Sequence, residues 1–423
     1  MRLRLVGVAG CVILALGVAA CGGDDEGSGS GGGSAASGES AGGGSVNVYS
    51  SLPVQGASKD QIGALINGIR LALEEAGGKA GGVTVNYESL DDSTAQAGGW
   101  DPGQTAQNAR KVAQDPDAVY YIGEFNSGAS AVSIPILNQA GVPQVSPSNT
   151  YVGLSTDAPG SEKGEPDKYY PTGERTYLRI VPIDTVQASA LLTAMAEDGC
   201  AKVALANDQD TYGSGLSRLI ELSAQDAGLE LTENVSIDKA ASNFRSVAED
   251  FKAQNADCFL FAGQTASNAV QLYKDVGAAL PDAKLYGPDG VCESGFTNPA
   301  KGGIPAALGQ RFRCTIATLD LQSYPGGRDF IDAYEAKYGE DKPDPYAIYG
   351  YEAMKLGLDT IASIDGEITK EAVLEALFAT QDRDSVLGTY SFDENGDTTL
   401  TDYGVYVVGD DGNPTFDSSV TSE

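Results

Sequence analysis

Short apolar runs alternate with amphipathic segments from residue 46 onward. The runs at 46–50, 83–90 and 118–123 are rich in Val and Tyr, and helical patterns fill the intervals at 59–76 and 102–114. Short β-rich runs are typical of strands, and strand–helix–strand alternation is typical of a parallel sheet with helices on both faces. The first part of the chain therefore predicts an α/β unit.

A second series of strands and helices is predicted after residue 180. Its strands are expected at 203–207, 231–236, 258–262 and 284–287, and its helices at 213–227, 244–255 and 266–277. At 423 residues the chain is long enough for two such domains. The chain is expected to pass between them near 180–184 and 319–324, and a helix at 346–364 should return to the first unit.

These crossings predict lobes that are discontinuous in sequence. The first lobe is expected to comprise residues 46–181 and 325–387, and the second residues 182–324 and 388–423. The predicted fold class is α/β, with two Rossmann-like lobes joined by a hinge of several crossovers.

The N-terminal residues carry a targeting pattern. Arg2 and Arg4 precede an apolar stretch at 11–18 that is too short to span a bilayer, and residues 18–21 (VAAC) follow it. This pattern resembles a bacterial lipobox, which implies a signal peptide over 1–20 and lipidation of Cys21. A plain secretory signal followed by a chance Cys is the alternative.

The segment after Cys21 has no apolar residue larger than Ala. Residues 22–45 consist of Gly, Ser, Ala, Asp and Glu alone. Such a segment cannot bury apolar surface, so 21–45 is predicted to be a lipid anchor and a disordered tether. The folded part is expected to be held at the outer face of a membrane.

Four further cysteines lie in the second unit. An exported location is oxidising and no CxxC spacing occurs, so two disulfides are favoured over a metal site. Three pairings are possible. Cys200 and Cys258 each precede an apolar run and should lie at the same end of neighbouring parallel strands, which leaves Cys292 to pair with Cys314.

Charge and composition exclude several classes of function. The formal charge is −32, whereas nucleic-acid binding needs cationic contacts to phosphate, so no nucleic-acid partner is expected. The chain has no His, which removes Ser-His-Asp and Cys-His mechanisms and imidazole-ligated metals. No enzyme activity, cofactor or metal site is predicted.

Acidic clusters leave two alternatives to weigh. The aspartates at 91–92, 208–210 and 410–411 could supply the paired carboxylates of a glycosidase, but in so acidic a chain they are interpreted as solvating charge. The loop at 393–397 lacks the twelve-residue spacing of a calcium loop and is interpreted as a hairpin turn.

Six short motifs follow one another through both predicted lobes. They are IGEFNSGAS at 122–130, IPI at 134–136, GVPQVSPSNT at 141–150, YLRI at 177–180, DTYGSG at 210–215 and GPDG at 287–290. In this order they resemble the solute-binding proteins of branched-chain amino-acid ABC importers, over about residues 46–410. The resemblance implies the type I periplasmic binding protein fold, an amino acid held between the lobes, and an ABC permease as partner. The protein is expected to be a monomer.

The first lobe is expected to bind the ligand's carboxylate. Ser127 follows a strand and opens a helix, where a hydroxyl and free backbone N–H groups favour an anion. Thr150 closes the loop at 146–150 and, by the resemblance, makes a second polar contact to the ligand. Ordinary capping and turn chemistry is the alternative for both residues.

The second lobe is expected to bind the ammonium. Asp289 lies in a Gly-Pro-Asp-Gly segment after a strand, and the resemblance aligns it with the family's acidic residue, usually a glutamate. A solvated turn aspartate is the alternative. Tyr212 opens a helix and resembles a tyrosine that closes over the ligand; a partly buried aromatic without contact to a ligand is the alternative.

Two loops depart from the family where side-chain selectivity would be set. Residues 263–266 lack the aromatic that many relatives have, and residues 52–59 lack a tyrosine. Leucine, isoleucine or valine is the expected ligand, while another amino acid, a short amide or an aromatic acid stays open. Trp100 is expected to pack on its own helix rather than line the cleft. A ligand-sensing receptor module is not expected, since no transmembrane or kinase segment follows.

Overall fold

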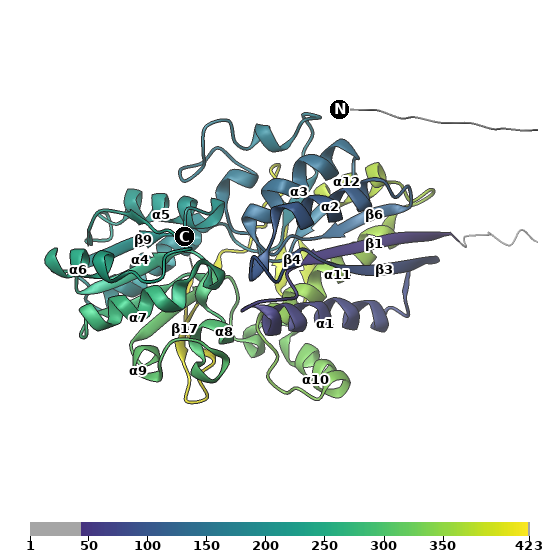
Figure 1. Ribbon diagram of the computed structural model, residues 1–423. Helices are drawn as coiled ribbons and strands as arrows, with labels where there is room; N and C mark the ends of the chain where they lie inside the picture. The colour runs from purple at the N-terminus through teal and green to yellow at the C-terminus, as the bar shows by residue number, and fades with distance from the viewer. Residues whose placement is uncertain (1–43, 422–423) are drawn as a thin grey trace, which may run out of the picture. The chain divides into compact units, whose positions relative to one another are not determined.

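The computed structural model describes residues 44–421. The predicted signal peptide, Cys21 and all but the last residues of the predicted tether lie outside these residues. Two main sheets organise the rest: in Figure 1 one contains β1, β3 and β6, and the other contains β9 and β17. Each sheet belongs to one of the two predicted α/β units.

The first sheet has the order β2-β3-β1-β6-β7-β8. Its strands are β1 (Ser45–Leu52), β2 (Lys79–Ala80), β3 (Val83–Asp91), β6 (Ala118–Ile122), β7 (Gln144–Ser146) and β8 (Tyr177–Arg179). Only the short β2 runs antiparallel to its neighbour. The parallel arrangement brings the carboxyl ends of β1, β3, β6 and β7 to one edge.

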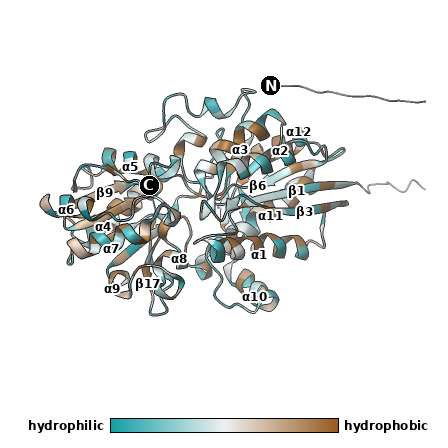
Figure 2. Cartoon of the chain, in the orientation of Figure 1, coloured by the Kyte–Doolittle hydropathy of each residue, from teal (hydrophilic) through white to brown (hydrophobic). Residues whose placement is uncertain are grey.

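Helices cover both faces of this sheet. They are α1 (Lys59–Glu75) and α11 (Tyr346–Ser363) on one face and α2 (Pro102–Ala113) and α3 (Ser127–Gln139) on the other. Successive residues of a strand point to opposite faces of the sheet. In β6, Tyr120 and Ile122 pack with α1 and α11, whereas Tyr121 packs with α2 and α3. Figure 2 shows the mixed hydropathy that such one-sided burial requires, for example along α1.

The second sheet has the order β10-β9-β12-β13-β14-β17-β18, with β11 also paired to β9. Its strands are β9 (Lys202–Asn207), β10 (Glu230–Leu231), β11 (Val235–Ser236), β12 (Cys258–Ala262), β13 (Lys284–Gly287), β14 (Phe312–Ile316), β17 (Asp402–Val408) and β18 (Pro414–Thr421). It is parallel up to β14, and β17 and β18 are antiparallel additions.

Helices also flank the second sheet. They are α4 (Asp184–Glu197) and α5 (Thr211–Ser223) on one face and α6 (Arg245–Ala253) and α7 (Ala269–Ala279) on the other. Alternate residues of β12 divide between them, since Leu260 packs with α4 and α5 while Phe259 and Phe261 pack with α6 and α7.

The single strand predicted at 231–236 is wrong. Leu231 pairs with Val203 but Val235 pairs with Ala206, so one extra residue interrupts the ladder. At the break the hydroxyl of Thr232, instead of a backbone carbonyl, accepts the N–H of Leu205 at 3.2 Å. The segment forms two short strands as a result.

The chain passes between the sheets three times. It leaves the first sheet after β8, returns from β14 to helices packed on the first sheet, and re-enters the second sheet at β17. The remaining α-helices and strands are β4 (Ser93–Thr94), β5 (Gly99–Trp100), α8 (Ser294–Thr297), α9 (Ala306–Gly309), α10 (Gly327–Tyr338), α12 (Lys370–Phe378), β15 (Arg383–Ser385) and β16 (Gly388–Tyr390). The residue-level lobe boundaries given above stay a prediction.

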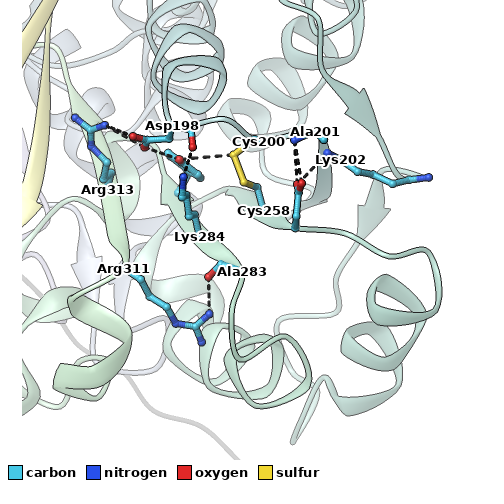
Figure 3. The surroundings of a disulfide bond; sticks show 11 residues. Asp198, Cys200, Ala201, Lys202, Cys258, Ala283, Lys284, Arg311 and Arg313 are labelled. Atoms are coloured by element: carbon cyan, nitrogen blue, oxygen red, sulfur yellow. Dashed lines mark hydrogen bonds and ion pairs between the residues drawn. A yellow bond between two sulfur atoms is a disulfide. The ribbon is translucent and has the colours of Figure 1, made fainter.

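Two disulfides brace the second sheet. Cys200 is bonded to Cys258, with their Cα atoms 5.9 Å apart, and Cys292 is bonded to Cys314, with their Cα atoms 5.5 Å apart. These are the pairs expected from the sequence. Figure 3 shows the first bridge beside Asp198, whose carboxylate accepts two 3.0 Å hydrogen bonds from Arg313. This bridge joins the starts of β9 and β12, which are neighbours in the sheet.

Candidate functional site

The four residues expected to hold a ligand lie around one cavity. Its lining residues are Phe125, Asn126, Ser127, Ser148, Thr150, Tyr212, Gln264, Asp289, Gly290 and Tyr346. The space amounts to about 330 Å³, including its open mouth. Ser127, at the start of α3, and Thr150, in the loop after β7, belong to the first sheet's side of the cavity, and Tyr212, in the first turn of α5, and Asp289, in the turn after β13, belong to the second sheet's side. Their role toward a ligand stays a prediction.

Ser127 is the first residue of α3 and lies directly behind the carboxyl end of β6. Its side chain is buried, and its hydroxyl oxygen accepts the N–H of Tyr151 at 3.4 Å. The first N–H groups of a helix have no partner inside the helix and carry partial positive charge. This wall of the cavity therefore suits an anion.

The loop that carries Thr150 is tied to the loop that carries Ser127. The hydroxyls of Ser146 and Ser148 donate to the carbonyls of Glu124 and Phe125, each at 2.8 Å, and the Asn149 amide donates to Phe125 at 2.8 Å. Because these groups satisfy one another, the two anion-facing loops are held in one arrangement without a ligand.

A buried ion pair supports Thr150 from behind. The guanidinium of Arg179 is fully buried and donates to the carbonyls of Asn149 and Tyr151, at 3.2 and 2.8 Å, on either side of Thr150. Its Nε donates to Asp397 at 2.6 Å. Sequence reasoning assigned no role to Arg179, although an Arg inside the apolar segment YLRI is a signal of buried partners.

Asp397 closes the turn at 393–397. The N–H of Asp393 donates to the Asp397 carbonyl at 2.9 Å, and Phe392 and Thr398 form an antiparallel bridge. The interpretation of this segment as a hairpin turn is confirmed. Among the described residues no group of three or more His, Cys, Asp or Glu side chains could hold a metal ion.

Asp289 and Tyr212 face each other across the second half of the cavity. The Tyr212 hydroxyl lies 2.5 Å from Asp289 Oδ1 and 2.7 Å from Gln187 Oε1, but it has a single proton to donate. When that proton goes to Gln187, the contact with Asp289 requires a proton on the carboxyl. Burial raises the pKa of Asp289 to about 6, which favours that protonated state at acidic pH.

A second carboxyl lies close to Asp289. Asp184, the first residue of α4, is fully buried, and neither of its side-chain oxygens makes a well-formed hydrogen bond among the described residues, although the hydroxyl of Thr150 lies near them. Burial, and then the charge of Asp289, raise its pKa well above the usual range. This half of the site thus carries carboxyl groups and no Lys or Arg, and it suits a cation.

A second cavity continues the first. It shares Phe125, Asn126, Gln264, Asp289 and Gly290 with the first cavity, and its space amounts to about 390 Å³, including its open mouth. Its further lining residues are Pro53, Gln55, Ser58, Gln61, Gly98, Gly99, Trp100, Thr265, Ala266 and Glu293. Both loops that were expected to set side-chain selectivity, at 52–59 and 263–266, contribute residues to this wall.

The expectation that Trp100 packs on its own helix is wrong. The β4–β5 hairpin turns the indole toward the start of α3, so that a Cβ built on Gly128 would lie 2.6 Å from Trp100 Cζ2. Trp100 therefore lines the second cavity. A lone loop Trp offers no sequence signal of this, because the contact is made with a helix that begins well beyond it in the chain.

Several lining residues were not found from the sequence. Asn126 donates to Gln264 Oε1 at 2.9 Å, which joins a loop of the first sheet to a loop of the second. The rings of Phe125 and Tyr346 meet edge to face at 5.3 Å. These residues are polar or aromatic loop and helix-end positions like many others, so only tertiary structure distinguishes them.

A family model described as "Periplasmic binding protein" matches residues 47–413 of the chain. The chain belongs to the periplasmic binding protein family. It is thus an extracytoplasmic solute-binding protein of the ABC-transporter type, and this family is one of binding proteins rather than enzymes. The two-lobed α/β fold predicted from the sequence is confirmed.

Characterised periplasmic binding proteins are related in sequence. The chain is 25% identical over 348 residues to the leucine-, isoleucine-, valine-, threonine- and alanine-binding protein of Pseudomonas aeruginosa, covering 80% of this chain and 83% of the relative. It is 26% identical over 346 residues to the Leu/Ile/Val-binding protein BraC3 of Rhizobium johnstonii, covering 80% and 85%.

Solved structures share the fold. A leucine-binding protein from Thermotoga maritima superposes with a TM-score of 0.72 at 21% identity, over 89% of this chain and 99% of the other. A solute-binding protein from R. palustris in complex with benzoate gives 0.71 at 18% identity, over 90% and 98%. One architecture therefore accommodates both an amino-acid and an aromatic-acid binder.

The interpretation of the aspartate clusters as solvating charge is wrong for two of them. Asp92 is fully buried, and Asp208 is buried beside the site, where it accepts hydrogen bonds from the Gln264 N–H at 3.0 Å and the Ser267 hydroxyl at 2.8 Å. Asp208 thereby holds a loop of both cavities. The cluster at 410–411 is exposed, as expected.

Asp92 forms a carboxyl pair with Glu124 in this periplasmic binding protein. Burial raises the pKa of Asp92 well above its usual range and that of Glu124 to about 7, and Glu124 accepts the Tyr121 hydroxyl at 2.5 Å. Neither carboxyl lines either cavity of the site. The pair therefore has no direct access to a molecule bound there, as a glycosidase mechanism would require.

Between residues 44 and 421, no helix combines the length and apolarity needed to cross a bilayer.

Proposed function

We propose that this periplasmic binding protein captures a free amino acid between its two lobes and delivers it to an ABC permease in the membrane. The observation that carries the proposal is the division of one cavity into an anion-accepting half, with Ser127 and Thr150, and a cation-accepting half, with Tyr212 and Asp289. An α-amino acid presents both charges on one carbon.

The amino acid's carboxylate is held at the start of α3 and its ammonium by ionised Asp289. An isolated buried carboxylate is costly, and an ammonium within hydrogen-bond reach removes much of that cost. A carboxylic acid without an amine, such as the benzoate of the R. palustris structure, leaves Asp289 unpaired. The relatives in Pseudomonas and Rhizobium are both named for leucine, isoleucine and valine, and the first also for threonine and alanine, so a branched-chain ligand is the expectation from similarity alone. The side chain of the bound amino acid would lie in the second cavity.

Closure of the lobes is the signal to the permease. Only a closed arrangement brings both halves to one ligand, so the ligand stabilises that state through its differential affinity. The hydrogen bond between Asn126 and Gln264 supports this idea, since it joins loops of the two sheets at the cavity. We expect the binding protein to act as a monomer.

The proposal is tested with a thermal-shift and calorimetry screen. Each amino acid is compared with its deaminated acid and its decarboxylated amine, which lack one of the two charges. A ligand at a hundredfold its Kd stabilises by about 2.7 kcal/mol. At least one amino acid should bind, and both matched analogues should bind at least about thirtyfold more weakly. Failure of every amino acid, or equal binding of a deaminated acid, contradicts the proposal.

The anchor is tested separately with Cys21→Ala. Lipidation at Cys21 should retain the protein at the membrane, and the variant should be released into the soluble extracytoplasmic fraction with unchanged affinity and unfolding midpoint. Ser28→Ala, in the predicted tether, is the matched control and should stay anchored. Membrane retention of the Cys21 variant contradicts the lipoprotein assignment.

A further inference from the structure

A buried carboxylate points into the second cavity. Glu293 precedes the short helix α8, lines this cavity and has 2% of its surface exposed. Neither of its side-chain oxygens makes a well-formed hydrogen bond among the described residues, and the hydroxyls of Thr265 and Ser58 lie close enough to offset part of the effect of burial on its pKa. Burial raises its pKa to about 7. Nearly all buried polar side chains in proteins are paired, so this one calls for an explanation.

The same wall contains a buried amide donor. Gln61 is 4% exposed and lines the cavity, and its amide nitrogen makes no well-formed hydrogen bond among the described residues, although its side chain lies near the carboxyl of Asp344. Figure 1 shows why these groups come together: α8, which follows Glu293, lies beside the start of α1, which carries Gln61. Ser58 and Thr265 add hydroxyls to this part of the wall.

The charges around Glu293 do not neutralise it. The acidic residues lining the two cavities are Asp289 and Glu293, and neither lining includes a Lys or an Arg. The further charges that bear on Glu293, those of Asp344 and Asp60, are negative, and Asp60 already pairs with Lys301 at 2.6 Å. An amino acid with an aliphatic side chain would neutralise Asp289 alone and would seal Glu293 in a dry cavity.

We infer that the ligand's side chain ends in a cationic nitrogen that binds Glu293, so that the protein selects a basic amino acid rather than a branched-chain one. This inference rests on the proposed function, because it takes the α-carboxylate and α-ammonium to lie in the first cavity. A cationic nitrogen supplies the hydrogen bonds and the charge that Glu293 lacks, and it leaves the apolar stem of the side chain against Trp100 and Phe125.

The first experiment compares matched ligands on the wild-type protein by calorimetry. Lysine and norleucine have the same carbon chain and differ by the terminal amine; ornithine, arginine, glutamine and leucine complete the set. At least one of the three basic amino acids should bind about tenfold or more tightly than norleucine and leucine. Equal or tighter binding of norleucine, leucine or glutamine overturns the inference.

The second experiment replaces the carboxylate by an amide of the same size. Glu293→Gln should weaken the tightest basic ligand by about thirtyfold or more and change norleucine affinity by less than about threefold. Glu335→Gln removes one exposed carboxylate and should change neither affinity. Equal losses for basic and aliphatic ligands would show a merely structural role for Glu293 and overturn the inference.

The Asp289→Asn variant distinguishes a failure of the proposed function from a failure of the basic specificity. If Asp289→Asn weakens all amino acids while Glu293→Gln discriminates among none, the proposed function stands and the basic specificity falls. If no amino acid binds the wild-type protein, both fall together.

Discussion

The two halves of the site differ in how far their polar groups are hydrogen-bonded before a ligand binds. On the first sheet, the loops at 124–127 and 146–150 are joined by hydrogen bonds to their backbone carbonyls and by Arg179, and the oxygen of Glu124 that lacks a partner lies outside the cavities. On the second, the buried oxygens of Asp184 and Glu293 make no well-formed hydrogen bond among the described residues, and Asp289 shares one tyrosine proton with Gln187. The loops of the first half are therefore held together without a ligand, whereas the carboxyl groups of the second half gain a partner when a ligand binds. Disruption of the first should therefore cost stability, and disruption of the second should cost affinity.

The largest effect should come from Arg179→Met. The substitution leaves Asp397 as a buried charge without its partner and removes the donors to both carbonyls around Thr150. Breaking a buried ion pair costs about 3–5 kcal/mol, so urea unfolding should show a loss of that order. Arg110→Met, at an exposed position of α2, is the control and should stay within about 0.5 kcal/mol. A similarly small loss for Arg179→Met would contradict the comparison.

Asp289→Ala, in contrast to Arg179→Met, should weaken ligand binding. Removal of the anion leaves the ligand's ammonium unpaired in a desolvated cavity, which costs about 2–5 kcal/mol of binding, or at least about thirtyfold in Kd. Stability of the ligand-free protein at pH 8 should not fall for the isosteric Asp289→Asn, because the buried carboxylate with its raised pKa is ionised there at a cost. Calorimetry and urea unfolding on the same variants measure both quantities.

Affinity and stability should also depend on pH in opposite directions, because both depend on the protonation of Asp289. The pKa of Asp289 is about 6 in the empty site, so a proton occupies it below that pH and competes with the ligand's ammonium. Affinity for an amino acid with an uncharged side chain, such as norleucine, should rise about tenfold from pH 5 to pH 7, with proton release on binding near pH 6. Stability of the ligand-free protein should change in the opposite sense, since the folded-state pKa is raised and stability is lost as pH rises through it. The Asp289→Asn variant should lose this component of both profiles.

The smallest effect concerns the hydrogen bond that joins the halves. Asn126→Ala removes the donor to Gln264, and Asn126 makes no side-chain cap bond to α3 that would complicate the result. One such bond contributes about 0.5–1.5 kcal/mol, so binding should weaken by about twofold to tenfold. A double-mutant cycle with Gln264→Ala measures the coupling directly. Additive losses would mean that the bond does not contribute to the bound state.

The sequence predicted those parts of the site that depend on local order. Strand–loop–helix patterns locate Ser127 and Asp289 at the carboxyl edges of parallel strands, and apolar runs beside Cys200 and Cys258 indicate their pairing. The unsuspected parts depend on contacts between distant segments. Arg179 meets a carboxylate 218 residues further along the chain, and the burial of Glu293 depends on how α8 packs against α1.

This long-range ion pair also bears on the order in which the molecule can be made. Arg179 belongs to the edge strand of the first sheet, yet its carboxylate partner arrives only with the third passage of the chain between the sheets. A ribosome that has synthesised the whole of the first sheet has therefore produced a lobe with a charged side chain in its interior and no counter-ion. We expect the first lobe to stay loosely folded until residue 397 has been added, a delay that suits a chain that crosses a membrane before it folds.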